Sequence, residues 1–179
     1  MIEGIHAAVS EYKQKWQALT RSAKDMAFFM ELTPNSIGWK VANIAEFDKT
    51  VASLRDHCDE VVHVWMNGRW IAKMILREGG AGLPWNIGII KIMQVRPGST
   101  DTLGLDHVDF YSPKEFVQIE SVLKNEAYKW SSEKNEASSP DLTWASIWFD
   151  NTEAKIKHYT VLDIYSSQLA GISARIKGE

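Results

Sequence analysis

Residues 104–113, GLDHVDFYSP, carry the side chains of this sequence that are best suited to chemistry. His107, Asp109 and Tyr111 alternate with apolar residues, which is the period of a β-strand and places the three polar side chains on one face. An imidazole, a carboxylate and a phenol that share a cavity could bind a metal, transfer a proton or hydrogen-bond a ligand. The alternative is an ordinary strand whose polar residues are satisfied by hydrogen bonds.

Two further residues belong with this group as candidates. Lys91 interrupts the apolar strand pattern NIGIIKIMQ, and a lone lysine there either reaches solvent at an edge or faces a pocket. In a pocket, Lys91 would favour an anionic ligand or pair with Asp109. His158 lies in IKHYTV, where its facing depends on a strand register that the sequence leaves open. We therefore predict ligand binding by His107, Asp109, Tyr111 and Lys91.

The first element that must support such a site is an N-terminal helix. A stripe with alternating steps of four and three predicts a helix over residues 2–31. Its apolar members are Ile5, Val9, Tyr12, Trp16, Leu19, Ala23, Met26 and Met30. The widening of the apolar face by Phe28 and Phe29 favours packing on the domain's own sheet. The alternative is a coiled-coil seam, which would make the chain a homodimer or a scaffold.

The remaining elements fall into two series of the same order. We expect strands and helices to alternate with turn-forming residues, and Asn67-Gly68 is a tight hairpin turn between two β-rich runs. Pro113 is expected to open the second series' helix, where its missing N–H costs nothing. The expected elements are a strand at 36–41, a helix at 45–57, a hairpin at 59–76, strands at 85–95 and 105–112, a helix at 113–126, strands at 128–132, 143–149 and 154–159, and a loosely helical tail from 161.

Composition narrows the class of protein. The chain of 179 residues fits one domain, or two fused modules, with a core that needs no disulfide or structural metal. A net charge of −3 without a basic block disfavours nucleic acid and anionic membranes as partners. Cys58 is the only cysteine, and no apolar run is long enough for a signal peptide or a membrane span, so we expect a cytoplasmic protein.

The two series resemble the paired βαβββ modules of the vicinal oxygen chelate superfamily, the glyoxalase and bleomycin-resistance fold. A narrower resemblance, which includes the extra N-terminal helix, is to its YecM-like branch. It is carried by four segments: WMNGRWIAKMIL (65–76), WNIGIIKIMQVRPG (85–98), GLDHVDFYSP (104–113) and KIKHYTVLDIY (155–165). It implies an α+β fold in which a first module at 36–95 and a second at 105–165 wrap a shared cavity within a single domain, 1–179.

In that superfamily, metal ligands come from the first and last strands of each module. The resemblance implies His107 and His158 as ligands in the second module. The first module departs from the pattern, because Ser36 or Gly38 stands where a histidine is expected and Lys91 where a carboxylate is expected. A divalent metal is therefore the cofactor to consider, with half of its ligand set missing.

Three functions follow from these observations. The favoured one is binding of a small polar or anionic molecule in the sheet cavity. A metal-dependent lyase, isomerase or dioxygenase-like enzyme is the alternative, so catalysis stays open. A helix-mediated interaction or scaffold protein is the third, and the fold alone does not choose among them.

Overall fold

The computed structural model describes residues 1–66, 68–77, 82–96, 98–134, 143–149 and 152–160. Its centre is an eight-stranded sheet with the order β2-β3-β4-β1-β5-β8-β7-β6. The strands are β1 (Thr33–Val41), β2 (Cys58–Met66), β3 (Arg69–Leu76), β4 (Ile89–Gln94), β5 (Gly104–Tyr111), β6 (Lys129–Lys134), β7 (Thr143–Phe149) and β8 (Thr152–Lys157). The helices are α1 (Ile2–Arg21), α2 (Met26–Glu31), α3 (Ile44–Leu54) and α4 (Phe116–Lys124), with 3-10 turns at Arg55–His57 and Pro84–Asn86.

Strand pairing shows two copies of one topology. In the first, β1 runs parallel to β4, and β2, β3 and β4 follow one another antiparallel. In the second, β5 runs parallel to β8, and β6, β7 and β8 are antiparallel. The two first strands, β1 and β5, pair antiparallel and join the halves. The expected fold class, α+β with two βαβββ modules in a glyoxalase-like sheet, is confirmed.

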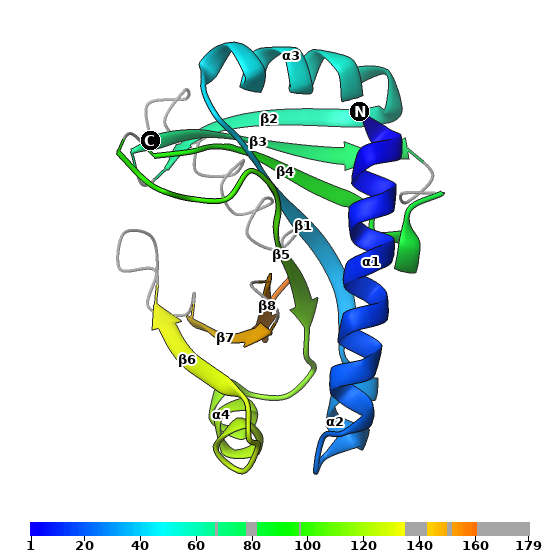
Figure 1. The fold of residues 1–179 in the computed structure, drawn as a ribbon, viewed down its shortest axis with the longest axis vertical. Coiled ribbons are helices and arrows are strands. Elements are labelled where there is room, and N and C mark those ends of the chain that lie inside the picture. The colour runs from blue at the N-terminus through cyan, green and yellow to red at the C-terminus, as the bar shows by residue number, and fades with distance from the viewer. Residues whose placement is uncertain (67, 78–81, 97, 135–142, 150–151, 161–179) are drawn as a thin grey trace, which may run out of the picture.

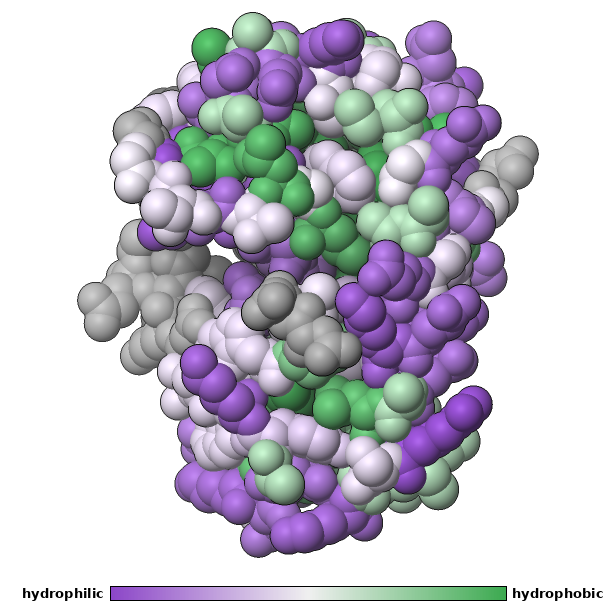
Figure 2. Space-filling view, viewed as in Figure 1, coloured by the Kyte–Doolittle hydropathy of each residue, from purple (hydrophilic) through white to green (hydrophobic). Residues whose placement is uncertain are grey.

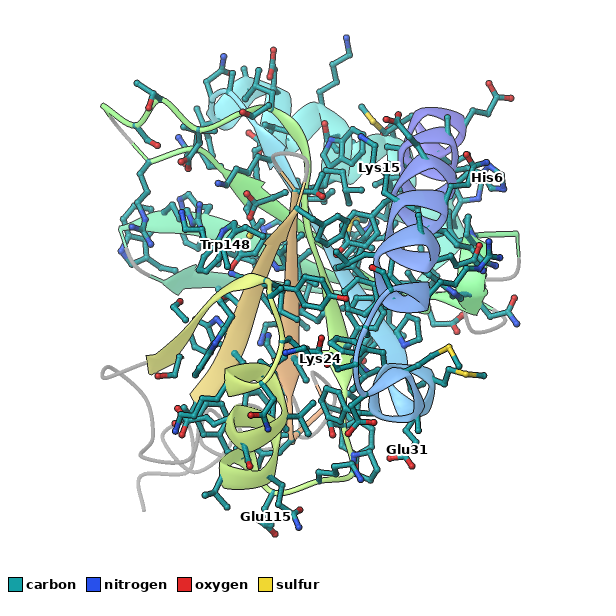
Figure 3. The ribbon with its side chains drawn as sticks, turned by 60° about the horizontal axis from the view of Figure 1, so that its bottom comes forward. His6, Lys15, Lys24, Glu31, Glu115 and Trp148 are labelled. Carbon is teal, nitrogen blue, oxygen red and sulfur yellow. The ribbon has the colours of Figure 1, made fainter. Side chains whose placement is uncertain are left out.

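The helices lie outside a curved sheet. Figure 1 shows the sheet bending around an open side, with α3 over the first half, α4 over the second and α1 along the centre. The stripe on α1 packs inward: Trp16 stacks on Phe110 of β5 with ring centroids 4.4 Å apart. His6, on the opposite side of α1, points away from the sheet (Figure 3). The stripe from Ile5 to Trp16 is thus buried within the chain and is not free for a partner helix.

Several boundaries differ from expectation, and three of the differences have an identifiable local cause. The N-terminal helix is two helices, because Asp25 caps α2 through Phe28 N, while the Glu126 carboxylate accepts from the backbone N–H groups of Lys24 and Asp25. The second-half helix begins at Phe116 behind the capping residue Glu115, so Pro113 precedes it.

The third difference lies before β4. Trp85 and Asn86 adopt left-handed backbone angles in a 3-10 turn, which delays the start of β4 to Ile89. The predicted C-terminal helix from residue 161 lies outside the described residues. None of the helices in the described part of the chain is long and apolar enough to cross a membrane.

Candidate functional site

The candidate site is on the face of the sheet opposite α1. Val108 and Phe110 of β5 point into the hydrophobic core, so the alternation of the strand turns His107 and Asp109 to the other, concave face. This was the orientation expected from sequence. The strands β1, β4 and β8 bring their own residues to the same place, since β5 pairs with β1 and β8, and β1 with β4.

Asp109 is the centre of the site, and only 1% of it is exposed. Its Oδ2 is paired with the Lys91 ammonium and accepts a hydrogen bond from Ser36 Oγ. Its Oδ1 lies 2.7 Å from Lys157 Nζ. Burial alone would raise the pKa of Asp109, but the ammonium groups of Lys157 and Lys91 lower it well below its usual value. Lys91 therefore pairs with Asp109, one of the two roles its position predicted.

His107 is held through both ring nitrogens. Nε2 lies 2.9 Å from Lys91 Nζ, and Nδ1 lies 2.7 Å from Asp106 Oδ2. Burial, together with the positive charges of Lys155 and Lys91, lowers the pKa of His107 from 6.5 to about 3. The ring is therefore neutral near pH 7. An ammonium only donates, so Nε2 accepts from Lys91 and the proton sits on Nδ1, which donates to Asp106.

Two features of β1 and β5 make room for this arrangement. A Cβ on Gly38 would overlap His107 Cε1 and lie 2.7 Å from Met93 Cε, so the glycine leaves room for the imidazole over β1. The β1–β5 register shifts between Gly38 and Trp39, which leaves Asp106 as the extra residue of a bulge. The bulge allows Asp106 and His107, neighbours in sequence, to meet side chain to side chain.

Strand β8 supplies residues that sequence reasoning missed. Glu153, Lys155 and Lys157 pair in register with His107, Asp109 and Tyr111, and so share their face. Glu153 accepts from Ser146 Oγ at 2.6 Å and lies 3.6 Å from Lys155 Nζ. The alternation in TEAKIK is the signal that could have found them, but the expected strand began two residues too late, at 154.

Cations outnumber carboxylates around Asp109. The ammonium groups of Lys155 and Lys157 lie 5.5 and 5.7 Å from the ring centre of Trp144. Burial, together with the charge of Lys157, lowers the pKa of Lys73, the register partner of Lys91, to about 8. Burial also lowers the pKa of Lys91 to about 7, although Asp109 opposes that shift. Lysine side chains are thus crowded on this face of the sheet.

Tyr111 and His158 are placed differently from each other. Tyr111 ends β5, half-buried, beside Lys157 in register, and so keeps the facing that was expected. The His158 ring lies 6.3 Å from the ring of Phe116, the first residue of α4, and 5.2 Å from the ring of Tyr159. Among the described residues, the carboxylates and imidazole that come together are Asp106, His107 and Glu153, so the structure does not bring His158 to His107.

A divalent metal fits this donor set poorly. One ligand atom from each of Asp106, His107 and Glu153 lies within 4.8 Å of the others. However, each of these groups already has a cationic or hydrogen-bonded partner: Lys40 Nζ lies 2.7 Å from Asp106 Oδ1, Lys155 lies near Glu153, and Lys91 contacts Nε2 of His107. Lysine ammonium groups repel a metal ion, and the donors are neutralised without one.

Comparisons with known proteins bear on the fold. No family model matches the chain, and no curated protein matches its sequence. A solved structure described as structural-genomics protein EC4020 has a TM-score of 0.64 at 16% identity, covering 88% of this chain and 89% of that one. The likeness of this pair is one of fold.

Two groups of enzymes also appear among the structural neighbours. A methylmalonyl-CoA epimerase from Streptomyces coelicolor has a TM-score of 0.46 at 16% identity, with 72% of this chain and 99% of that one covered. An extradiol ring-cleaving dioxygenase from B. fuscum has a TM-score of 0.46 at 7% identity, covering 73% of this chain and 33% of that one. Both belong to the vicinal oxygen chelate superfamily.

Proposed function

We propose that the concave face binds a small anionic molecule, held through Lys157 and Lys155 and without a metal ion. The observation that carries the proposal is the charge around Asp109. A single buried carboxylate faces two ammonium groups, Lys91 and Lys157, and Lys155 stands beside them in register. An anion at this position would complete the pairing.

A charge removed from water is tolerated when it is paired, and an unpaired surplus costs free energy. Lys91 takes one side of Asp109 together with His107, which leaves Lys157 and Lys155 as the cations best placed to meet a ligand. Figure 2 shows the surface indented between the two halves of the molecule, with hydrophilic residues in the indentation. A carboxylate or a phosphate ester carries the charge that this position supports.

The experiment is a titration with small anions of defined chemistry. Acetate, succinate, citrate, inorganic phosphate and a phosphate monoester are added to the purified protein, and binding is measured by calorimetry. Replacing Lys157 by methionine leaves Asp109 paired with Lys91, so the variant should fold. Loss of one charged hydrogen bond, about 1.5–3 kcal/mol, should weaken the best ligand by roughly 10- to 100-fold.

A matched control separates the site from general charge effects. Lys124 lies on α4 with its side chain 63% exposed. The Lys124→Met variant removes the same charge from the surface and should leave the affinity unchanged. Equal weakening by both substitutions, or no binding of any tested anion by the wild type, would refute the proposal.

The other functions receive less support from the site. A metal-dependent lyase, isomerase or dioxygenase-like enzyme needs open ligands, and here Asp106, His107 and Asp109 are all engaged by lysines or by one another. A scaffold that pairs through α1 needs the stripe that the chain buries in its own core. A homodimer stays a prediction.

Finer assignments belong to the same proposal. The four segments that resemble the YecM-like branch support that branch, and β1 to β8 support a single domain with modules at 36–95 and 105–165. Cys58 is a free, buried thiol, which is consistent with a cytoplasmic location.

A further inference from the structure

We infer that the ammonium of Lys91 is the built-in cation of this site and takes the place of the divalent metal that the resemblance implies. This role of Lys91 does not depend on which anion binds. Lys91 stands where the resemblance to that superfamily implies a carboxylate.

The donors converge on the ammonium as they would on a metal ion. His107 Nε2 lies 2.9 Å from Lys91 Nζ, and Asp109 Oδ2 is ion-paired with the same atom. The two donors come from β5, while Lys91 reaches them from β4 across β1. Gly38 of β1 supplies no side chain there, and the space that a ligand side chain would fill is taken by the imidazole.

The charge and the N–H donors of Lys91 suit it to the place of a metal ion. An ammonium carries one positive charge and has three N–H donors, so it can satisfy a carboxylate oxygen and an imidazole lone pair together. A metal ion beside it would meet like charge within a few ångströms, and in a buried site that repulsion is poorly screened. The cation between His107 Nε2 and Asp109 Oδ2 is therefore one that is covalently attached to the chain.

The arrangement also fixes the tautomer of His107. Nε2 must keep its lone pair toward Lys91, so the ring proton lies on Nδ1 and faces Asp106. A metal bound at Nε2 would leave the same tautomer but remove the ammonium contact. The tautomer alone does not distinguish a metal ion from the Lys91 ammonium, so an experiment must replace the ammonium.

The first test gives the site a carboxylate in place of the ammonium. In Lys91→Glu, the side chain at position 91 joins Asp109 and His107 as a third donor. Metal-free protein is titrated with Co²⁺, followed by visible absorption and by metal content after gel filtration. We expect stoichiometric uptake by Lys91→Glu and none by the wild type, with uptake lost in Lys91→Glu/His107→Gln. The exposed control Lys124→Glu makes the same charge change and should behave like the wild type.

The second test uses the unaltered protein, so it does not depend on the variant's folding. Nitrogen-15 NMR of the histidine rings should show His107 protonated at Nδ1 and unprotonated at Nε2 at pH 6, where Lys91 keeps its proton, with no change on adding Co²⁺. Stoichiometric Co²⁺ uptake by the wild type that His107→Gln abolishes would overturn the inference. So would a proton on Nε2, or a folded Lys91→Glu protein that takes up no Co²⁺.

Discussion

Replacing Asp109 by asparagine tests the charge balance of the site most directly. The substitution keeps the shape of the side chain but leaves Lys91 and Lys157 without their shared carboxylate. Removing one partner of a buried ion pair costs about 3–5 kcal/mol, because the remaining charge stays in a poorly solvated place. Asp109 is 1% exposed, so the upper part of that range applies.

The pKa of Lys91 indicates the same direction. Burial lowers it to about 7 even with Asp109 in place, because the carboxylate only partly offsets the desolvation of the amine. Without Asp109 the pKa of Lys91 should fall further, and Lys157 should keep its charge with no carboxylate beside it. We therefore expect Asp109→Asn to lower the free energy of unfolding by about 3–5 kcal/mol, toward the upper end of that range.

Urea denaturation at pH 7, followed by tryptophan fluorescence, measures this loss. Adding Lys91→Met to Asp109→Asn should recover part of it, because the unpaired ammonium is removed with its partner. The effects of residues in contact are not additive. The double variant should therefore lose at least about 1 kcal/mol less free energy of unfolding than the two single variants lose together. A single-variant loss under about 1 kcal/mol, or strict additivity, would show that Asp109 does not hold these lysines.

Three further outcomes follow from the same contacts. Gly38→Ala should cost about 1–3 kcal/mol in urea denaturation, because its Cβ overlaps the His107 ring and the Met93 methyl; an unchanged midpoint would contradict the close packing. Because the folded-state pKa of His107 is lowered to about 3, the unfolded chain binds the proton first, so stability should fall by up to about 5 kcal/mol between pH 6.5 and 3, and His107→Gln should flatten that slope. Trp16→Ala should cost about 3–5 kcal/mol by removing the stack on Phe110, yet leave anion affinity unchanged in calorimetry, because the helix covers the opposite face.

The sequence was sufficient for the elements and for one strand of the site. The hairpin at Gly68, the strand 143–149 and the facing of His107 and Asp109 all follow from local patterns that short-range physics controls. Local patterns do not reveal the register between neighbouring strands. A strand's alternation shows which side chains share a face but not which residue of the neighbouring strand lies beside them.

The parts of the site that the sequence did not reveal depend on the register between strands. Lys157 reaches Asp109 because β8 pairs parallel with β5 at one particular offset. Asp106 reaches His107 because of a bulge whose signal is in the pairing of two strands, not in either alone. Gly38 matters because of a ring that comes from another strand. Each of these contacts joins residues whose proximity only the assembled sheet creates.

The two proposals for this site can fail independently, since they depend on different lysines. Lys157→Met should weaken anion binding while leaving the His107 tautomer and the absence of Co²⁺ binding as they are. Lys91→Glu should open a metal site, and by adding a negative charge beside Asp109 it should also weaken an anion held at Lys157. Anion binding that survives in Lys91→Glu at full strength would place the ligand away from Asp109, while Co²⁺ uptake by that variant would still identify Lys91 as the resident cation.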